Sequence, residues 1–334
     1  MLPEKVLAAI ENETLRANIQ KRPNRYLGSV GSAGLETLML QTLDNLVALF
    51  GDTGQGHLQI ELTPQQLLFS LDSSQPLDFA GLSNETQTPL LFLTAWLALS
   101  EQFGISFELP NTRKIYIYQK GLRVQQLDIP MANQRCYKLE LALQPNQHFF
   151  GTERPSYFKL FRRCQQLAFL NSGLQISLTD GLKQKNDFCY QNGLTEYLYQ
   201  QDERLTRMSQ PLTFKVADAH LQLAVAVSKN SAARIKDTFV NGQLPIAGGT
   251  HYEGFIDGMV AALNQHLEQT KRIKYITREN FTDRFDFVLA LKIKHPRYTG
   301  VFKKKIRNPE LYQQVKDHTF DKVTQFLNRH SSWY

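Results

Sequence analysis

Residues 34–50 read GLETLMLQTLDNLVALF, and their apolar side chains recur at the three- and four-residue steps of a helix with one buried face. Gln41 and Asn45 lie one turn apart on a different face of that helix. An asparagine with an acid one turn before it would suit a metal ion and an attacking water, but here the earlier position holds an amide. The stretch therefore predicts a helix built like that of an enzyme site, and it raises the question whether the chemistry survives.

The composition is that of a globular protein with two domains. The chain has 334 residues, of which 42% are hydrophobic and 21% charged, and this length exceeds one ordinary core. The longest apolar run, LLFLTAWLAL at 90–99, is too short for a membrane span. The N-terminal segment carries acids through its apolar part and lacks a cationic flank, so we predict no secretory signal and take a cytoplasmic location as the default.

The cysteines and histidines do not indicate a structural metal site. Cys136, Cys164 and Cys189 are odd in number and widely spaced, and we expect them to be reduced thiols. The eight histidines are scattered, without an i, i+4 pair and without cysteines at zinc spacing. We therefore predict no structural metal.

The net charge of +7 is concentrated near the C-terminus. Residues 271–307 contain twelve basic residues and three acids, a local charge of +9. Such a stretch is either a solvated face or an electrostatic footprint for nucleic acid, because lysine and arginine bind phosphates without reading a sequence. The residues alone leave both interpretations open.

The pattern along the chain predicts an α+β fold, in which helices are interspersed with a nearly contiguous group of strands. In the first part we expect helices at 4–20, 34–50, 89–104 and 156–171, and strands at 57–63, 66–72, 105–109, 114–121, 135–143 and 172–180. After a break in the pattern at 198–211 we expect strands at 211–217, 221–229 and 285–296, and helices at 254–272 and 311–328. We place the boundary near residue 208, which predicts domains 1–207 and 208–334.

Four motifs, in order along the chain, resemble one protein family. KRPNRYLGSVGSAGLETLMLQTLDN (21–45) resembles the opening of the ATPase domain of the B subunit of DNA gyrase and its topoisomerase IV counterpart. QQLAFLNSGLQISLTD (165–180) resembles the last helix and strand of that domain. TFVNGQLPIAGGTHYEGF (238–255) and ALKIKHPRYTGVFKKKIRNPE (290–310) resemble the signature and the nucleotide-reaching loop of the transducer domain that follows. The resemblance implies a Bergerat-type (GHKL) mixed sheet with helices, followed by a ribosomal-protein-S5-like transducer.

The resemblance assigns roles to the first long helix. In the family, a glutamate on this helix activates the attacking water, and an asparagine one turn later binds magnesium. Aligned through LDN, the magnesium position is Asn45 and the general-base position holds Gln41. An amide cannot accept the proton, and the loss of a positioned base typically slows a reaction by about 10²- to 10⁴-fold. We therefore expect no catalytic residue at this position.

The other nucleotide contacts of the family are only partly matched. Asp72, in SLDSSQP, stands at the position of the adenine-binding acid, but the glycines that follow it in the family are absent. The family's phosphate lid is rich in glycine, whereas residues 82–103 contain none. The stretch YKLEL at 137–141 does not match the family's threonine motif. No cofactor is expected unless the pocket is retained, in which case it would hold ATP and magnesium.

The transducer domain adds one candidate residue for nucleotide contact and a group of candidate residues for DNA contact. Aligned through Gly300, the family's glutamine is Val301 and its lysine is Lys303, so Asn45, Asp72 and Lys303 are the candidate nucleotide ligands. Transducers of the family line a cavity that accommodates a DNA segment. The resemblance therefore implies DNA contact by Lys292, Lys294, Arg297, Lys303, Lys304, Lys305 and Arg307.

These departures favour a stand-alone, noncatalytic pseudo-ATPase that associates with DNA, with a type IIA topoisomerase, or with both. Because the sequence ends at Tyr334, where family members continue into a cleavage domain, we expect no DNA cleavage by this chain. One alternative is a genuine ATP-binding topoisomerase subunit in which Asp44 or Glu36 replaces the base. Another is a mimic of the gyrase subunit that binds its partner or a toxin. Residues 1–20 lack the tyrosine of the family's dimerisation arm, and homodimerisation stays open.

Overall fold

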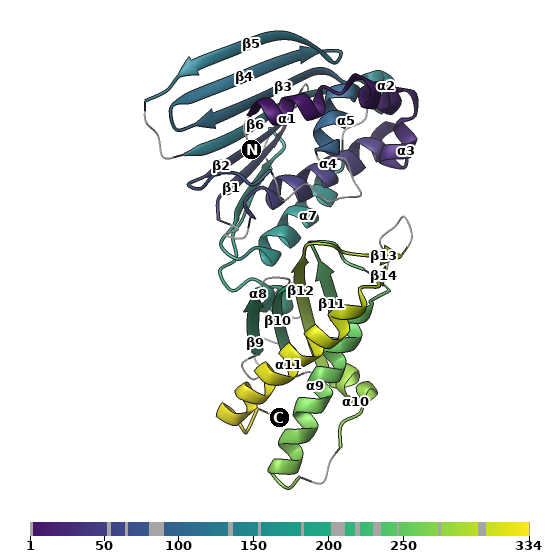
Figure 1. Ribbon diagram of the computed structural model, residues 1–334, viewed down its shortest axis with the longest axis vertical. Coiled ribbons are helices and arrows are strands. Elements are labelled where there is room, and N and C mark those ends of the chain that lie inside the picture. Colours follow the sequence, from purple (N-terminus) through teal and green to yellow (C-terminus); the bar gives the residue numbers. More distant parts are fainter. Residues whose placement is uncertain are drawn as a thin grey trace. The chain divides into compact units, whose positions relative to one another are not determined.

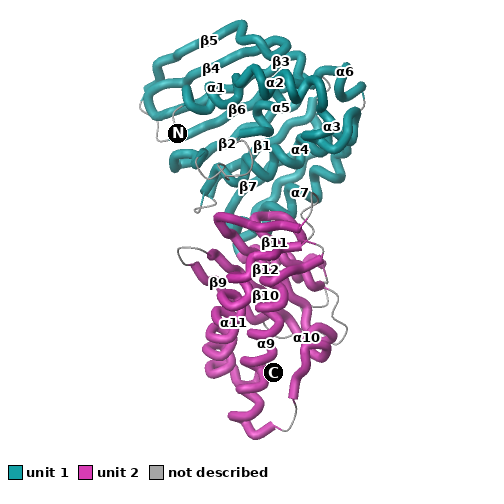
Figure 2. The backbone as a smooth tube through the Cα atoms, turned by 45° about the vertical axis from the view of Figure 1, so that its right-hand side comes forward, with its two compact units in different colours: residues 1–191 teal, residues 192–334 magenta. Residues whose placement is uncertain are grey.

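The computed structural model describes most of the chain as two compact units, residues 1–191 and 192–334 (Figure 2). Each unit has its own hydrophobic core. The described residues are 3–51, 55–63, 66–79, 90–132, 136–152, 155–181, 184–201, 211–217, 221–229, 235–245, 247–272, 275–299 and 305–333. None of the described helices combines the length and the hydropathy needed to cross a membrane.

Unit 1 is built on an eight-stranded sheet with the strand order β5-β4-β3-β6-β2-β1-β7-β8. Its strands are β1 (His57–Leu62), β2 (Leu67–Ser73), β3 (Ser100–Leu109), β4 (Thr112–Gln119), β5 (Leu122–Pro130), β6 (Tyr137–Pro145), β7 (Gln175–Thr179) and β8 (Lys185–Phe188). β1 and β7 run parallel, and the other neighbouring strands are antiparallel. The sheet is therefore mixed, as the resemblance implies.

Helices cover one face of this sheet (Figure 1). They are α1 (Pro3–Ile10), α2 (Glu13–Lys21), α3 (Pro23–Leu27), α4 (Gly31–Ala48), α5 (Leu91–Leu99), α6 (Gln147–Phe150) and α7 (Tyr157–Leu170). Side chains along β2 alternate strictly between buried and half-buried, because successive residues of a strand point to opposite faces. We call the helix-packed side the covered face and the other side the open face.

The predicted helix at 34–50 forms as α4, and the predicted apolar stripe faces the core. Leu35, Leu38, Met39, Thr42 and Leu46 are all buried. The other predicted elements of unit 1 differ in detail. The helix expected at 4–20 is two helices, because the side chain of Asn12 accepts a hydrogen bond from the backbone N–H of Leu15 at 2.9 Å and starts α2.

Two further differences involve strands. The helix expected at 89–104 ends at Leu99, and β3 begins at Ser100. The apolar run before this point is buried on every side, so it has no periodicity that would mark the end of the helix. β5 has no counterpart among the strands expected from the sequence. Its alternation is interrupted by a bulge at Val124, where the register against β4 shifts by one residue.

Unit 2 packs two long helices against a four-stranded sheet with the order β11-β12-β10-β9. Its elements are α8 (Leu194–Gln201), β9 (Leu212–Ala217), β10 (Leu221–Lys229), β11 (Lys236–Val240), α9 (Thr250–Gln269), α10 (Arg278–Arg284), β12 (Phe285–Ile293), β13 (Tyr298–Thr299), β14 (Lys305–Ile306) and α11 (Pro309–Arg329). β9 and β10, the strands expected at 211–217 and 221–229, pair antiparallel. β13 and β14 form a separate two-stranded hairpin.

The units divide between Gln191 and Asn192, earlier than the predicted boundary at 207/208. The reason is α8, which belongs to unit 2. The Tyr197 hydroxyl donates a hydrogen bond to Asp237 Oδ2 at 2.5 Å, and its ring lies edge-on to Phe239 at 5.9 Å. The sequence break at 198–211 that suggested a boundary begins within this helix and continues past its end.

The glycine turn that precedes α9 contacts β14 of the hairpin through Gly249 and Ile306. Gly249 has φ +145°, and a Cβ atom there would lie 2.4 Å from the backbone oxygen of Ile306 in β14. His251, at the start of the helix, is fully buried and hydrogen-bonds Thr238 at 2.9 Å, and burial lowers its pKa to about 4. Gly248, Gly249 and His251 therefore serve the turn and its packing.

Replacing Gly249 by alanine should destabilise unit 2 by about 2–4 kcal/mol, because the new Cβ meets backbone atoms that cannot move aside. Gly248→Ala is the matched control. It has φ +65° but its nearest neighbours are 3.6 Å away, so only the left-handed backbone is penalised, at about 1 kcal/mol. Urea unfolding of both variants measures the difference. Equal losses would show that the close approach to β14 is not a constraint.

Candidate functional site

Gln41 and Asn45 lie one turn apart on α4, as predicted. Gln41 is exposed. The Asn45 side-chain amide donates a hydrogen bond to the backbone oxygen of Gln41 at 2.7 Å, within its own helix. Asn45 thus makes the local hydrogen bond typical of an asparagine in a helix.

The two acids that could replace the missing base are tied to α7. Glu36 binds Lys159 at 2.5 Å and accepts a hydrogen bond from the backbone of Ser156, and the bond from Lys159 lowers its pKa. Asp44 pairs with Arg163 at 2.6 Å, and the two side chains are only 23% and 13% exposed. Carboxylates held by cations are weak proton acceptors, so both serve to pack α4 on α7.

Asp72 lies on the open face of the sheet, whereas α4 lies on the covered face. Asp72 stands opposite His57 of β1 and Lys138 of β6, and directly opposite residues of a sheet point the same way. Its neighbours Leu71 and Ser73 are the buried ones. The structure therefore does not bring Asn45 and Asp72 together, and Asp72 is not placed for the adenine contact predicted from the alignment.

The covered face near α4 is filled with apolar side chains. Leu139 and Leu141 of β6, in the stretch that fails to match the threonine motif, are buried in the core. Trp96 of α5 donates its indole N–H to the Thr42 hydroxyl at 2.7 Å and packs on Phe150 at 6.3 Å. Phe92, Trp96 and Leu97 are core residues. Of the glycine-free stretch at 82–103, residues 82–89 lie outside the described residues, and residues 91–103 form α5 and the start of β3. The candidate Lys303 also lies outside the described residues.

The open face carries a cavity of about 790 Å³, within the range of small-molecule sites. Glu140 lies in it and binds Arg113 at 2.6 Å, Lys138 at 2.8 Å and the Ser106 hydroxyl at 3.0 Å. Burial would raise the pKa of Glu140, but the hydrogen bonds from Lys138 and Ser106 outweigh burial and lower it. Its charge is thus balanced within the protein.

A second group in this cavity contains serine, histidine and aspartate but is not a nucleophile site. The Gln59 amide N–H lies 3.1 Å from His57 Nδ1, which makes Nδ1 the acceptor and leaves the proton on Nε2. His57 Nε2 is 2.8 Å from the Ser177 hydroxyl, which is 2.5 Å from Asp187. The imidazole therefore donates to Ser177 and cannot remove its proton. Burial lowers the pKa of His57, which keeps it neutral.

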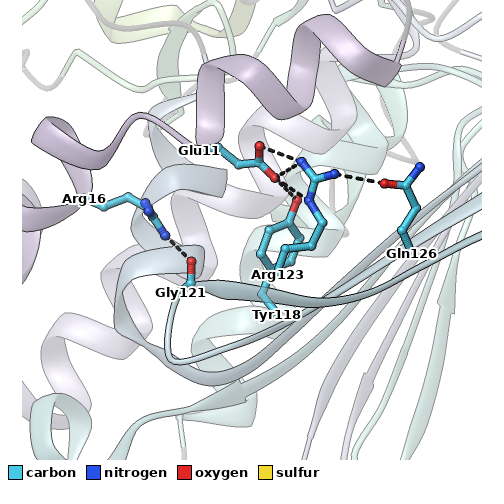
Figure 3. A network of polar contacts seen from close by, with 6 residues as sticks. All are labelled: Glu11, Arg16, Tyr118, Gly121, Arg123 and Gln126. Carbon is cyan, nitrogen blue, oxygen red and sulfur yellow. Dashed lines mark hydrogen bonds and ion pairs between the residues drawn. The ribbon is translucent and has the colours of Figure 1, made fainter.

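The N-terminal helices are attached to the β4–β5 hairpin by a polar network (Figure 3). Arg123 binds both carboxylate oxygens of Glu11, at 2.5 and 2.7 Å. The buried Tyr118 hydroxyl donates to the same carboxylate at 2.6 Å, and burial followed by this bond raises the Tyr118 pKa. Arg123 also donates to Gln126 at 2.9 Å. Residues 3–21 are thus packed on their own sheet.

Unit 2 presents the basic residues around the β13–β14 hairpin. The backbone N–H of Arg307 donates to the backbone oxygen of Arg297 at 2.8 Å, which brings these two residues side by side. Buried Asn308 holds the base of the hairpin through the backbone of Arg297 at 2.7 Å and of His295 at 3.0 Å. The predicted DNA contacts that the structure describes are all exposed, namely Lys292, Lys294, Arg297, Lys305 and Arg307. Lys303 and Lys304 lie outside the described residues.

The basic run at 271–307 is not one continuous patch. β12 separates its two halves, and a nine-residue strand spans about 27 Å. In the first half, Arg278 is paired with Glu253 at 2.7 Å and also with Asp257, so part of that charge is neutralised. The second half, around the hairpin, is the denser cationic surface.

Comparisons with known proteins agree with this architecture. Residues 193–333 match the family model of DNA gyrase B. The chain is 25% identical to the chloroplastic/mitochondrial DNA gyrase B protein of Oryza sativa subsp. japonica, covering 93% of this chain and 49% of that protein. It is 24% identical to the DNA gyrase B protein of Streptococcus pneumoniae, covering 88% of this chain and 51% of that one. The chain spans about half the length of these curated relatives.

Solved structures show the same fold. The 43K ATPase domain of Thermus thermophilus gyrase B, in complex with an aminocoumarin, superposes with a TM-score of 0.81 at 17% identity, over 95% of this chain and 91% of that one. The topoisomerase IV ATP-binding domain of Francisella tularensis, in complex with a small-molecule inhibitor, gives 0.74 at 19%, over 93% and 91%.

The fold therefore defines the class: the chain is an α+β protein of the GHKL ATPase fold with a second α+β unit. More particularly, residues 193–333 are similar to DNA gyrase B, and the chain shares its fold with the ATPase-domain structures of gyrase B and topoisomerase IV, in agreement with the sequence resemblance.

The pairing of Asp44 with Arg163 predicts a stability role for this acid. Asp44→Asn should destabilise unit 1 by about 1–2 kcal/mol, because it leaves a mostly buried guanidinium without its counter-charge. Lys185→Gln breaks the exposed pair with Asp187, at 68% and 49% exposure, and should change stability by less than about 0.5 kcal/mol. Chemical denaturation measures both. A neutral Asp44→Asn variant would contradict the packing role and leave Asp44 open as a base.

Proposed function

We propose that this gyrase-B-like chain is a noncatalytic pseudo-ATPase that associates with DNA through unit 2. The observation that carries the first half is the placement of Asp72 on the opposite face of the sheet from Asn45. A nucleotide site needs its base-binding and metal-binding groups on one side. The apolar filling around Trp96 and Leu139 supports the same conclusion.

The missing general base supports loss of turnover independently of binding. Gln41 occupies the base position, and the nearby acids Glu36 and Asp44 are ion-paired to α7. A genuine ATP-driven topoisomerase component, the main alternative, would require one of these acids to leave its partner. We therefore favour the pseudo-ATPase over an active enzyme.

The cationic hairpin supports the DNA half of the proposal. Exposed lysines and arginines on and beside a small hairpin can each neutralise a phosphate without reading bases. The relatives are named as DNA gyrase subunits, and association with a type IIA topoisomerase is part of the proposal. A mimic that binds only the topoisomerase would lack the DNA affinity.

Isothermal titration calorimetry with a nonhydrolysable ATP analogue and magnesium tests the nucleotide half. We expect no binding heat from the folded wild-type protein, under conditions where a working gyrase B ATPase domain binds. The variant Gln41→Glu restores the base and should still show no ATP turnover, because the other contacts are not assembled. Binding that Asn45→Ala abolishes, or turnover in Gln41→Glu, would overturn the pseudo-ATPase proposal.

Salt-dependent fluorescence anisotropy with a DNA duplex tests the other half. Replacing Arg297, Lys305 and Arg307 by alanine should weaken binding and reduce the slope of log K against log [salt] by about 2–3. The control replaces Lys271, Arg272 and Arg284, three exposed cations beyond the other end of β12, and should leave the slope nearly unchanged. If the two triple variants behave alike, the hairpin is not the DNA surface.

A further inference from the structure

β5 is a long sheet edge with unusual exposure. All nine residues of the strand are exposed, and β5 ends the strand order of the unit 1 sheet. Leu122, Val124, Leu127 and Ile129 are 68%, 59%, 40% and 40% exposed. An edge strand offers unpaired backbone groups to another strand, and proteins usually guard it with lysines, prolines or bulges. β5 contains no lysine and its proline is the last residue, so its protective features are the bulge and the charged residues Arg123 and Asp128.

The order of residues in β5 is self-complementary. Residues 122–129 read LRVQ followed by QLDI. When this stretch is laid antiparallel to a copy of itself about a two-fold axis at Gln126, with the bulged Val124 left unpaired, Arg123 faces Asp128. The same register places Leu122 against Ile129, and the two-fold symmetry repeats each pair. Opposite charges and aliphatic pairs are the combinations that stabilise antiparallel neighbours.

The bulge makes this register possible. In a regular strand, residues whose numbers differ by an odd amount point to opposite faces, so Arg123 and Asp128 could not meet on one face. In β5 the register shifts between these residues. Arg123 stands opposite Tyr118 of β4, and Asp128 opposite Lys114, which are an even number of residues apart. Both charged side chains therefore lie on the covered face.

Leu122, Leu127 and Ile129 lie on the other face. Leu122 stands opposite Gln119 of β4, and Ile129 opposite Arg113, again an even number apart. Leu127 is on the same side, opposite Ile115, which lines the open-face cavity. In the self-paired arrangement, the aliphatic side chains of two copies would meet on the open face and remove each other from water.

The charged residues at this edge are already held in position. Arg123 is fixed by Glu11, and Asp128 accepts a hydrogen bond from Thr112 at 2.6 Å and lies 3.8 Å from Lys114. In the self-paired arrangement, Arg123 of one copy would lie beside Asp128 of the other. The charges of Glu11, Arg123, Asp128 and Lys114 would then alternate in sign across the two copies. Side chains that are already ordered lose little entropy when they pair.

From these observations we propose that β5 is a dimerisation edge, where a second copy of this chain adds antiparallel to form one continuous sheet across two unit 1 domains. The proposal is independent of the nucleotide and DNA functions proposed above. It names a surface for homodimerisation that does not involve the N-terminal helices, since those pack on their own sheet.

Sedimentation equilibrium over about 1–100 μM is the first test. The wild-type protein should show a concentration-dependent dimer, and Val124→Lys should raise the dimer dissociation constant at least tenfold by placing like charges at the edge. If Val124→Lys folds poorly, Leu122→Lys is a second variant at an exposed position. It should raise the dimer dissociation constant in the same way. Phe158→Lys, an equally exposed apolar site on α7, is the control and should stay dimeric. A monomeric wild-type protein, or an undisturbed Val124→Lys dimer, would overturn the proposal.

Disulfide crosslinking tests the register. In a background with Cys136 and Cys189 replaced by serine, the double variant Leu122→Cys, Ile129→Cys should form interchain disulfides upon mild oxidation, because paired residues have Cα atoms about 4.5–5.5 Å apart. Each single variant should not crosslink, since seven residues of strand separate the two cysteines by about 23 Å. Crosslinking by a single variant, or none by the double variant, would overturn this register.

Discussion

The alternation of side chains along the strands of unit 1 is the constraint on which the rest of the structure depends. Only one face of the eight-stranded sheet is covered by helices, so each strand residue is committed either to the core or to the open face. Moving a residue from one face to the other would require a register change along the whole strand. The core, the cavity and the placement of Asp72 all follow from this commitment, whereas the chemistry of any single side chain does not alter it.

The fold could be predicted from the sequence because its strongest signals are periodic or local. The stripe of Leu35, Leu38 and Met39 predicts α4 and its buried face. Signals failed where periodicity was absent. The fully apolar run of α5 gives no signal for where the helix ends. The bulge in β5 interrupts the alternation that would predict a strand.

The candidate site was less predictable, because an alignment gives positions along the chain and no directions in space. Asp72 matches a family acid in sequence, yet its side chain points away from α4. The charge count between 271 and 307 likewise sums residues that β12 holds apart. Ion pairs between distant segments, such as Asp44 with Arg163, have no local signal at all. Gln41 was the exception, since an amide cannot be a general base in any orientation.

The attachment of the N-terminal helices has a consequence for how the chain folds. Glu11 lies between α1 and α2 and is separated from Arg123 by 112 residues. Its partner therefore becomes available only after most of unit 1 has been synthesised. Closing so long a loop is entropically unfavourable until the contact is made, and such non-local contacts slow folding. During synthesis α1 and α2 leave the ribosome before the rest of unit 1, with the buried faces of Val6, Ile10 and Ile19 still uncovered. A segment made before the rest of its unit is thus among the last parts of that unit to be secured, and in that interval its apolar side chains are what a chaperone would bind.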